Sequence, residues 1–374
     1  MKIVFVSDFL NHHQTTLCDN IHSQVDDFHF IHGYKGKGSK IKQREEREYT
    51  MLYKDNPEKA KEEILSADAV IFGACPSRLI ELRMKENKLS FVYSERLFKK
   101  SVLQILKPRN YKLVKQRYLS YKDKNLYILA ASAFLSYDLS HYNFPKEKIF
   151  KWGYFPEMEK INTYEKKENS ILFAGRFLDW KHAETVIKTA KLLNNDKIDF
   201  KVSLVGDGPE KEKLQSLVKK YNINSCVEFL GIKSHQEVMQ LMNEHKIFMF
   251  TSSFREGWGA VLNEAMANGC AVVTSSAAGA TPFLVKHNQN GKVYKYGKNK
   301  DAYKCIKELL LNQSEIERFG ENAIKTIEND YSGEVAAGRL VEAVREFYET
   351  GTITPYENGV FSRADIIKNN WFKP

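Results

Sequence analysis

Residues 255–274 read REGWGAVLNEAMANGCAVVT, and the pattern of this stretch decides the fold class. Two glycines form a loop that leads into a helix beginning near Ala260. The apolar run Ala271–Thr274 that follows is typical of a strand buried on both faces, and Ile247–Phe250 supplies the strand before the loop. A strand, a glycine loop, a helix and a second strand are the repeating unit of a parallel sheet covered by helices.

Short apolar runs alternate with charged segments of helical length on both sides of this unit. In the second half of the chain, SILFAG (Ser170–Gly175) and KVSLVG (Lys201–Gly206) each end in a glycine turn before a helix. We therefore expect an α/β protein made of two doubly wound, Rossmann-like domains. The other predicted strands are Met1–Asp8, Ala67–Gly73, Leu89–Tyr93, Tyr127–Ala131 and Val227–Leu230.

A polar, Lys/Glu-rich stretch between the two series predicts the domain boundaries. We expect a first domain over residues 1–156, a linker over 157–169 and a second domain over 170–350. A final helix, about Gly333–Tyr348, precedes a tail over 351–374. Two such domains facing each other would leave a cleft at the carboxyl ends of their strands, where α/β sheets bind ligands.

The composition excludes several classes of protein. The chain has 374 residues, of which 43% are hydrophobic and 28% charged, so it can fill two cores and is not disordered. Its five cysteines form no CxxC or Cys/His ligand pattern, which argues against a disulfide scaffold and a structural zinc site. No stretch approaches the ~18 apolar residues of a membrane span, and the first apolar run is too short for a signal peptide. We therefore expect a cytoplasmic protein with reduced thiols.

The net charge of +10 is unevenly distributed. Residues 1–160 hold 28 Lys and Arg against 20 Asp and Glu, and the segment Lys99–Lys124 holds nine basic residues and one acid, Asp123. Nucleic acid, anionic lipid or a phosphorylated acceptor could each bind such a segment, and the simplest alternative is a solvated helix face. Because no base-reading motif accompanies the segment, we do not expect nucleic acid as the partner.

Two carboxylates in the opening stretch are candidates for binding hydroxyl groups. Glu256 precedes the glycine loop, and Glu264 lies about one turn into the predicted helix. A carboxylate can accept hydrogen bonds from two hydroxyls of a sugar or ribose at once, and the helix N-terminus offers free N–H groups. The alternative for each residue is an ordinary capping or solvated glutamate.

Two cations follow the predicted strand SILFAG. Arg176 comes directly after Gly175, and Lys181 lies a few residues further on. An Arg fork and a Lys point charge beyond the end of a strand can close on a diphosphate from the cleft side, whereas surface solvation is the alternative for each. The turn Gly206–Pro209 is expected to be structural, because its glycines and proline set a reversal from strand to helix.

Four motifs, in this order along the chain, resemble the retaining glycosyltransferase family 4, whose architecture is GT-B. Residues 175–181, GRFLDWK, are similar to the family's Gly-Arg-x4-Lys, and Glu256 with Glu264 to its Glu-x7-Glu. VGDGP (205–209) resembles the turn midway through the same domain, and VEFLG (227–231), followed by Glu237, the strand and loop beside the nucleotide base. The resemblance covers about residues 170–297.

The resemblance implies a retaining, metal-independent glycosyltransferase. The donor would be a nucleoside-diphosphate sugar, UDP-linked, the acceptor a saccharide or a lipid-linked saccharide, and the process bacterial surface polysaccharide or glycoconjugate synthesis. It implies no cofactor, and no Asp-x-Asp metal motif occurs in the chain. It also implies that the final helix crosses back to the N-terminal domain. The expected catalytic residues are Glu256, Arg176 and Lys181, and the expected donor-binding residues are Gly175, Arg176, Lys181, Glu256, Gly257, Trp258, Gly259, Ala260 and Glu264.

The N-terminal half matches the family loosely. The polar loop after the first strand contains Asn11, His12 and His13, and Glu95 follows a later strand. The resemblance places these residues on the acceptor or phosphate side. The alternatives are helix capping for the histidines and an ion pair with Arg96 for Glu95.

One loop of the second half departs from the family pattern. In SSAAGATPFL (275–284), Ala280 and Phe283 stand where the family usually has a second glycine and a glutamate. The identity of the donor sugar therefore does not follow from the resemblance.

The basic segment Lys99–Lys124 carries a further hypothesis. Pro108 is expected to divide it into two helical pieces with apolar residues between the cations. We expect it to contact the anionic inner face of the cell membrane, where a lipid-linked acceptor would be located. Each basic side chain near such a surface contributes about 1 kcal/mol to the free energy of binding.

A GT-B nucleotide-sugar 2-epimerase remains an alternative, because it would use the same cleft. A basic nucleic-acid-binding protein is a weaker one. Release of nucleoside diphosphate only when an acceptor is added separates a transferase from an epimerase.

Overall fold

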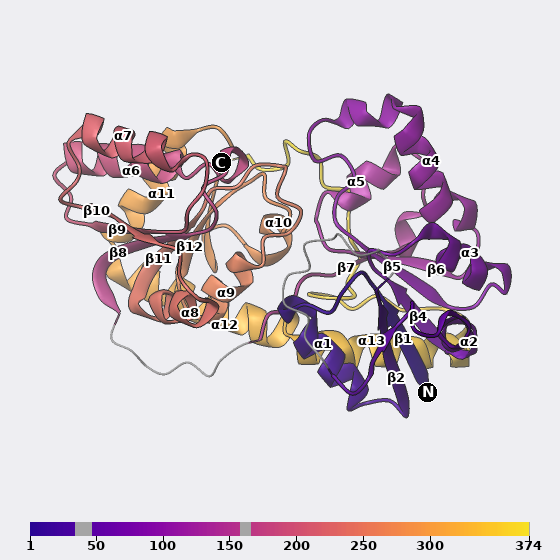
Figure 1. Ribbon diagram of the computed structural model, residues 1–374. Coiled ribbons are helices and arrows are strands. Elements are labelled where there is room, and N and C mark those ends of the chain that lie inside the picture. The colour runs from indigo at the N-terminus through magenta and orange to yellow at the C-terminus, as the bar shows by residue number, and fades with distance from the viewer. Residues whose placement is uncertain (34–46, 158–165, 374) are drawn as a thin grey trace. The chain divides into compact units, whose positions relative to one another are not determined.

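The structure is a computed structural model that describes residues 1–33, 47–157 and 166–373 (Figure 1). The chain divides into two units. The N-terminal unit comprises residues 1–157 and 330–367, and the C-terminal unit comprises residues 158–329 and 368–374. Each unit is built on one parallel sheet, as the alternation of apolar runs and helical segments predicts.

The sheet of the N-terminal unit has, among the described residues, seven parallel strands in the order β3-β2-β1-β4-β5-β6-β7. The strand order reverses between β1 and β4, which is where sheets of this kind bind ligands at their carboxyl edge. The strands are β1 (Lys2–Val6), β2 (Asp27–His32), β3 (Thr50–Leu52), β4 (Ala69–Phe72), β5 (Ser90–Ser94), β6 (Leu126–Ala130) and β7 (Ile149–Lys151).

The helices of this unit begin at recognisable sequence signals. Asn11 caps the first helix through its side-chain oxygen, and Asn56 followed by Pro57 opens the second. Pro108 opens a helix of its own, as predicted, after a separate 3-10 helix η1 (Val102–Leu106). The helices are α1 (His12–His22), α2 (Pro57–Ser66), α3 (Ser77–Lys85), α4 (Pro108–Arg117), α5 (Leu135–Ser140) and α13 (Gly333–Thr350), with further 3-10 helices η2 (Leu119–Tyr121) and η3 (Lys146–Lys148).

The last helix of the chain, α13, belongs to the N-terminal unit and packs against α1 (Figure 1). A Cβ at Gly333 would lie 2.8 Å from Cγ2 of Thr16, so glycine permits the close approach of the two helices. The boundary expected at residue 350 therefore lies at 329/330, because the apolar face of α13 is buried on the N-terminal unit.

The sheet of the C-terminal unit has six parallel strands in the order β10-β9-β8-β11-β12-β13, counted over the described residues. Here the strand order reverses between β8 and β11. The strands are β8 (Lys167–Ala174), β9 (Lys201–Val205), β10 (Val227–Gly231), β11 (His245–Phe250), β12 (Ala271–Ser275) and β13 (Gly291–Tyr294).

Helices cover both faces of this second sheet (Figure 1). On one face, α6 packs between α7 and α11, and together they enclose an apolar cluster that includes Ile171, Phe173 and Val202 of the strands. On the other face, α8 packs beside α9. The helices are α6 (Glu184–Asn195), α7 (Lys211–Tyr221), α8 (His235–Glu244), α9 (Val261–Ala267), α10 (Thr281–Leu284), α11 (Asn299–Leu310) and α12 (Gln313–Asp330), with the 3-10 helix η4 (Asp179–Lys181).

Two segments differ from the expected domain limits. The predicted linker 157–169 lies mostly outside the described residues, and β8 already begins at Lys167. The tail 351–374 does not stay with the N-terminal unit, because residues 368–374 belong to the C-terminal unit. There the indole N–H of Trp371 donates to the Ser276 carbonyl oxygen at 2.9 Å, and Phe372 packs on His287 with ring centres 5.1 Å apart.

Among the described residues, no helix has the length and the apolar content that crossing a membrane would require.

Candidate functional site

Two loops at the carboxyl edge of the C-terminal sheet carry most of the predicted donor-side residues. One follows β8, and the other follows β11, the two strands between which the sheet order reverses. The structure brings the side chains of the two loops together.

Glycine packing fixes the course of the loop after β8. Gly206 has a φ of +133°, and a Cβ there would lie 2.0 Å from the carbonyl oxygen of Gly175. The Gly175 N–H donates to the end of β9, and the Phe177 N–H donates to the Asp207 carbonyl oxygen at 2.9 Å. The predicted structural role of this turn is confirmed, since only glycine allows the two backbones to lie so close.

The 3-10 helix η4 is fastened to the loop after β11. The hydroxyl of Thr251 donates to the Lys181 carbonyl oxygen at 2.5 Å. The backbone N–H of Ser253 donates to the Trp180 carbonyl oxygen at 2.8 Å. The backbone that carries Lys181 is therefore positioned by the loop that carries Glu256.

Arg255 adds a side-chain connection between the same two loops. Its guanidinium donates to Oδ2 of Asp179 at 2.6 Å and lies 4.3 Å from the centre of the Trp180 ring. Such a planar cation stacked on an indole and paired with a carboxylate holds η4 in one orientation.

These contacts bring Lys181 and Glu256 into direct contact. Nζ of Lys181 forms an ion pair with Oε2 of Glu256, and this oxygen also accepts a hydrogen bond from the Ser252 hydroxyl at 3.0 Å. The two side chains are 18% and 16% exposed, so both still reach the surface. The pair offers a cation and a hydrogen-bond acceptor side by side, which suits a ligand that carries both an anionic group and hydroxyls.

Arg176 and Glu264 lie on the same sheet edge but differ in burial. Arg176 is exposed directly after Gly175. Glu264 stands in the first turn of α9 and is 7% exposed, with its Oε1 3.3 Å from Nε2 of His235. The alternative of a solvated helix glutamate is therefore wrong for Glu264.

The glycine loop before α9 is buried, including Gly257. Gly259 has a φ of +96°, and a Cβ there would lie 2.3 Å from Phe250, so only glycine fits. Ala260 is the N-cap residue of α9, a helix of 7 residues. Trp258 is fully buried, and its indole N–H donates to Asn263 at 2.8 Å. The Trp258 ring therefore belongs to the core, and the expected donor contact of this residue stays a prediction for its backbone N–H.

Phe283 explains the departure noted in the loop 275–284. It is 7% exposed and packs on Trp258 with ring centres 6.2 Å apart. An apolar residue at this position extends the core beneath the glycine loop.

A second site lies at the carboxyl edge of the N-terminal sheet, where β1 and β4 diverge. It is a cavity of 400 Å³, and we call it the N-terminal cavity. Most of the residues that line it carry a polar group. Burial raises the pKa of the Tyr93 hydroxyl there, with Tyr154 and Glu95 as further causes. The lining residues are Ser7, Asp8, Phe9, Asn11, Gln14, Gly73, Ala74, Tyr93, Ser94, Glu95, Arg117 and Tyr154.

Of the N-terminal residues predicted from sequence, Asn11 and Glu95 line this cavity, whereas His12 and His13 do not. Asn11 is occupied as the cap of α1, because its Oδ1 accepts from the His13 N–H at 3.0 Å and its amide donates to Gln14 at 2.8 Å. The His13 ring stacks on Tyr154, with ring centres 5.6 Å apart and an angle of 3° between the planes. His13 therefore contacts a residue that lines the cavity but does not line the cavity itself.

Glu95 pairs with residues other than Arg96, the partner considered from the sequence. Its Oε1 accepts from the Tyr154 hydroxyl at 2.7 Å, and its Oε2 pairs with Lys99. The alternative of an ion pair with Arg96 is wrong, because that guanidinium donates to Oδ1 of Asp138 at 3.0 Å.

The Arg96–Asp138 pair anchors the loop on which Glu95 lies. Both side chains are almost completely buried, and Oδ2 of Asp138 also accepts the N–H groups of Leu97 and Phe98 at 2.8 and 3.1 Å. Burial raises the pKa of the Asp138 carboxyl even though Arg96 opposes this shift. The loop after β5 is therefore fixed from beneath by a buried charge.

The residues of the basic segment Lys99–Lys124 fall into two groups, those that bind other parts of the N-terminal unit and those that face solvent. Arg117 donates to the carbonyl oxygens of Cys75 and Gly73 at 2.8 and 2.7 Å, and thus holds the loop after β4. By contrast, the outer side of η1 and α4 exposes large apolar side chains: Leu103 at 67%, Leu106 at 76%, Tyr111 at 48% and Leu113 at 48%. The exposed cations of the same surface are Lys100, Lys107, Arg109, Lys112 and Lys115.

Sequence reasoning missed Asp8, Arg117 and Tyr154 as parts of the cavity. Asp8 carried a weak signal as the polar end of the first strand. Arg117 and Tyr154 come from α4 and from the segment after β7, far from the strands whose ends they cover, and no local spacing marks them.

One group in the N-terminal unit has the ligand types and spacing of a metal site. Asp27, His29 and Glu63 lie close together on β2 and α2. Nζ of Lys2 already pairs with the carboxylates of Asp27 and Glu63, so a cation of the chain itself lies between these two carboxylates.

Comparison with known proteins agrees with this geometry. The sequence profile described as Glycosyl transferases group 1 matches residues 155–326. The uncharacterized glycosyltransferase MJ1178 of Methanocaldococcus jannaschii is 30% identical over 48% of this chain and 48% of its own length. The amylovoran biosynthesis glycosyltransferase AmsK of Erwinia amylovora is 23% identical over 72% of this chain and 67% of its own. The chain spans about half the length of the first curated relatives that it matches.

Among solved structures, Anabaena Alr3699/HepE in complex with UDP superimposes with a TM-score of 0.69 at 15% identity, covering 92% of this chain and 100% of that one. The likeness shows a shared fold, with two Rossmann-like α/β units. The fold class and the resemblance expected from the sequence are confirmed. Residues 155–326 are thus similar to the glycosyl transferases group 1 family, in a chain of GT-B fold.

Proposed function

We propose that the protein transfers a sugar from a UDP-sugar to a saccharide or lipid-linked acceptor, with retention of configuration at the anomeric carbon. The observation that carries the proposal is the Lys181–Glu256 pair, held between two loops at the strand reversal of the C-terminal sheet. The UDP seen with HepE, a protein of the same fold, supports UDP as the nucleotide.

Sugar transfer requires cationic groups and hydrogen-bond acceptors of negative charge close together in one site. As the bond between the anomeric carbon and the diphosphate breaks, positive charge develops on the sugar and negative charge on the leaving group. We assign the leaving diphosphate to Arg176 and Lys181, which would stabilise it as fixed cationic donors without a metal ion. Glu256, which keeps Lys181 in place, would accept hydrogen bonds from the hydroxyls of the transferred sugar.

Glu264 has a different part in this proposal. Its carboxylate is held beside His235 at the first turn of α9, close to the backbone of the glycine loop. A mostly buried carboxylate with one well-placed partner suits a fixed pair of hydroxyls, and we assign it to the nucleotide ribose.

The N-terminal cavity is the proposed acceptor site. Its polar lining offers both carboxylates and hydroxyls, which suit the hydroxyl groups of a saccharide. Glu95 is held by Tyr154 and Lys99, so its oxygens have fixed positions on this wall.

If the acceptor is lipid-linked, the exposed surface of η1 and α4 would contact the membrane that holds this acceptor. Three exposed leucines surrounded by exposed cations match an interfacial surface that inserts apolar side chains between anionic headgroups. AmsK, by its name a glycosyltransferase of amylovoran biosynthesis, is in keeping with an acceptor from bacterial polysaccharide assembly.

Thermal shift with a panel of nucleotide sugars tests the donor. A UDP-sugar that binds the folded chain should raise the melting temperature, by mass action, above that with the matching GDP- and ADP-sugars. Release of UDP should then require an added acceptor and persist in EDTA. No shift with any UDP-sugar would contradict the proposal, and UDP release that ignores acceptors while the sugar changes configuration would favour a 2-epimerase.

A further inference from the structure

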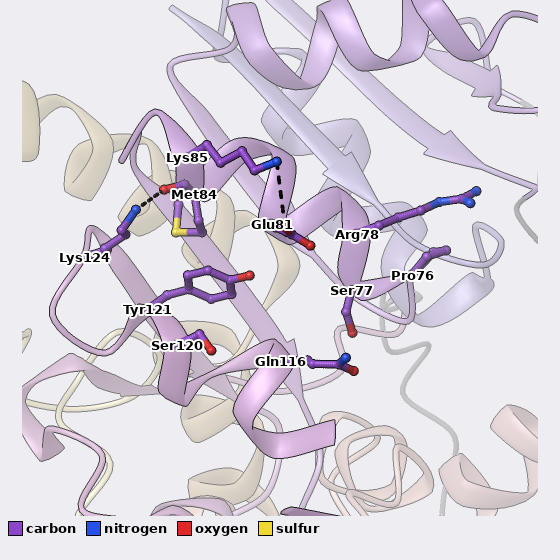
Figure 2. Close-up of a pocket in the computed structure, with 10 residues that line it drawn as sticks. All are labelled: Pro76, Ser77, Arg78, Glu81, Met84, Lys85, Gln116, Ser120, Tyr121 and Lys124. Atoms are coloured by element: carbon purple, nitrogen blue, oxygen red, sulfur yellow. Dashed lines mark hydrogen bonds and ion pairs between the residues drawn. The ribbon is translucent and has the colours of Figure 1, made fainter. Parts of the chain in front are cut away.

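A wide groove on the N-terminal unit has no part in the sites described so far. It has a volume of 840 Å³ and lies between α3, the end of α4 and η2 (Figure 2). Its lining residues are Pro76, Ser77, Arg78, Glu81, Met84, Lys85, Gln116, Ser120, Tyr121 and Lys124, and we call it the α3–α4 groove.

The groove combines an apolar face with many hydrogen-bonding groups. In Figure 2 the ring of Tyr121 lies between Lys124 on one side and Glu81 on the other, and the Met84 side chain beside this ring is fully buried. Burial raises the pKa of the Tyr121 hydroxyl, and the carboxylate of Glu81 acts in the same direction, so this hydroxyl stays a donor. Gln116 and two serines add amide and hydroxyl groups. A ring face surrounded by a carboxylate, an amide and hydroxyls is the chemistry that binds sugar rings.

The charge of the groove favours an acidic ligand. Three cations, Arg78, Lys85 and Lys124, line it against the single carboxylate of Glu81. Lys124 is bound to the Met84 carbonyl oxygen at 2.6 Å, and Lys85 lies 3.8 Å from Glu81. Arg78 is exposed, and in Figure 2 its side chain extends outward from α3, away from the Tyr121 ring, so it can meet a ligand that continues beyond the groove. A guanidinium in this position can bind a carboxylate through two parallel hydrogen bonds.

Other ligand classes fit the groove less well. A single tyrosine gives no row of stacking platforms for the bases of a nucleic acid. A cluster of phosphates carries more negative charge per group than the single carboxylates of a saccharide, so the Glu81 carboxylate at the side of the groove would repel it more strongly. A membrane needs a protruding apolar surface, whereas this region is hollow.

The groove adjoins the N-terminal cavity. Arg117 lines the cavity and its chain neighbour Gln116 lines the groove. Likewise Ala74 lines the cavity and Pro76 lines the groove, two residues along one loop and thus at most about 7 Å apart. Arg117 holds this loop through the carbonyl oxygens of Gly73 and Cys75, so the partition between the two hollows is fixed.

We propose that the α3–α4 groove binds a saccharide chain that bears carboxylates, and that this chain is the distal part of an acceptor whose reactive end lies in the N-terminal cavity. The acceptor part rests on the transferase function proposed above, whereas the binding of the acidic saccharide does not. The ligand class is therefore an acidic oligosaccharide of several rings, such as one containing uronic acids.

Titration calorimetry of the full chain with hexagalacturonate, and with the uncharged maltohexaose as control, tests the proposal. We expect binding of the hexagalacturonate alone. Arg78→Gln should weaken it about tenfold or more, as loss of a charge-assisted hydrogen bond does. Tyr121→Ala should weaken it by a similar factor. Lys146→Gln, on an exposed position of η3 outside the groove, should leave it unchanged.

Ser120→Trp guards against a folding effect of Tyr121→Ala, since Ser120 is exposed and the larger side chain fills the groove without removing a buried group. Equal binding of the two hexasaccharides, or equal affinities in the wild type, Arg78→Gln and Ser120→Trp, would overturn the proposal. UDP-sugar binding by the same variants keeps the two proposals apart. If the variants bind UDP-sugars but saccharide binding does not depend on the groove, only the groove proposal is wrong. If saccharide binding depends on the groove but no UDP-sugar binds, only the proposed transferase function is wrong.

Discussion

The β8/β11 edge of the C-terminal sheet and the β1/β4 edge of the N-terminal sheet have the same topology but hold their polar groups differently. In the C-terminal unit, glycines with positive φ bring backbones into contact, and the side chains then pair with one another, as Lys181 does with Glu256. In the N-terminal unit, a buried ion pair beneath the edge fixes one loop, and Arg117 reaches in from α4 to fix another.

This difference has a physical meaning. Backbone contact leaves little freedom for variation, because a Cβ at Gly206 or Gly208 has no room. A cavity lined by side chains can change its lining without moving the scaffold that supports it. The first arrangement suits a ligand part that is always the same, such as a nucleoside diphosphate, and the second suits a variable acceptor.

The largest expected effect comes from breaking the N-terminal edge from beneath. Asp138→Ala leaves the guanidinium of Arg96 buried without its carboxylate, and two backbone N–H groups lose their acceptor. Removal of one partner of a buried pair typically costs about 3–5 kcal/mol. Urea unfolding followed by circular dichroism should show this loss, with the exposed Asp123→Ala as control. A loss below about 1 kcal/mol would mean that the pair does not anchor the loop.

The next effect is on turnover at the C-terminal edge. Arg176→Ala and Lys181→Ala each remove a cation assigned to the leaving diphosphate, and each should lower the rate of transfer by about 10²–10³-fold. Steady-state release of UDP measures it, and Lys219→Ala, on an exposed position of α7, should retain the wild-type rate. Near-normal rates in both variants would show that the diphosphate is bound elsewhere.

A smaller effect separates the two glutamates of the C-terminal edge. Glu264→Ala should weaken UDP and the intact donor alike, by about tenfold, through loss of hydrogen bonds to the ribose. Glu256→Ala should weaken the intact donor and spare UDP, because UDP lacks the transferred sugar. Calorimetric titration with both ligands distinguishes the roles, and a matching loss of UDP affinity in both variants would contradict them.

The smallest effect per residue concerns the exposed surface of η1 and α4. Each of Lys107, Arg109 and Lys112 near an anionic bilayer should contribute about 1 kcal/mol, or roughly fivefold in partitioning at low salt. Co-sedimentation with anionic and neutral vesicles at two salt concentrations measures it, and Lys219→Gln is a matched control. Binding that ignores lipid charge and salt would assign the exposed leucines to another partner.

The sequence predicted the C-terminal edge far better than the N-terminal one. Close glycine packing leaves a motif along the chain, whereas contacts between side chains distant in sequence do not. Gly259 is constrained by the Phe250 ring and the turn after β9 by backbone contact, so these glycines leave a spacing that can be read along the chain. Asp138 and Tyr154 act across distances in sequence that no local pattern spans. The burial of the Trp258 ring could not be predicted, because the position of this residue in the motif says nothing of the direction in which its ring packs.

Strands were missed where charge interrupts the apolar pattern. β2 contains Asp27 and His29, and the sequence gives no sign that Lys2 on the neighbouring strand pairs with that Asp27 carboxylate. β13 opens with a glycine, and a Cβ at Gly291 would lie 2.6 Å from Val272, so a residue that usually weakens a strand is required here.

The path of the chain between the units has a consequence for the order of folding. The chain passes from one unit to the other at 157/158, 329/330 and 367/368, so α13 leaves the ribosome only after the C-terminal sheet and most of its helices. Until then the face of α1 that meets α13 has no cover, and a nascent N-terminal unit must wait, partly assembled, while the later unit is completed. The N-terminal unit is therefore still incomplete when the sheet of the C-terminal unit has been synthesised. A ribosome stalled before Gly333 should display an N-terminal unit that proteases cut readily beside a better protected C-terminal one.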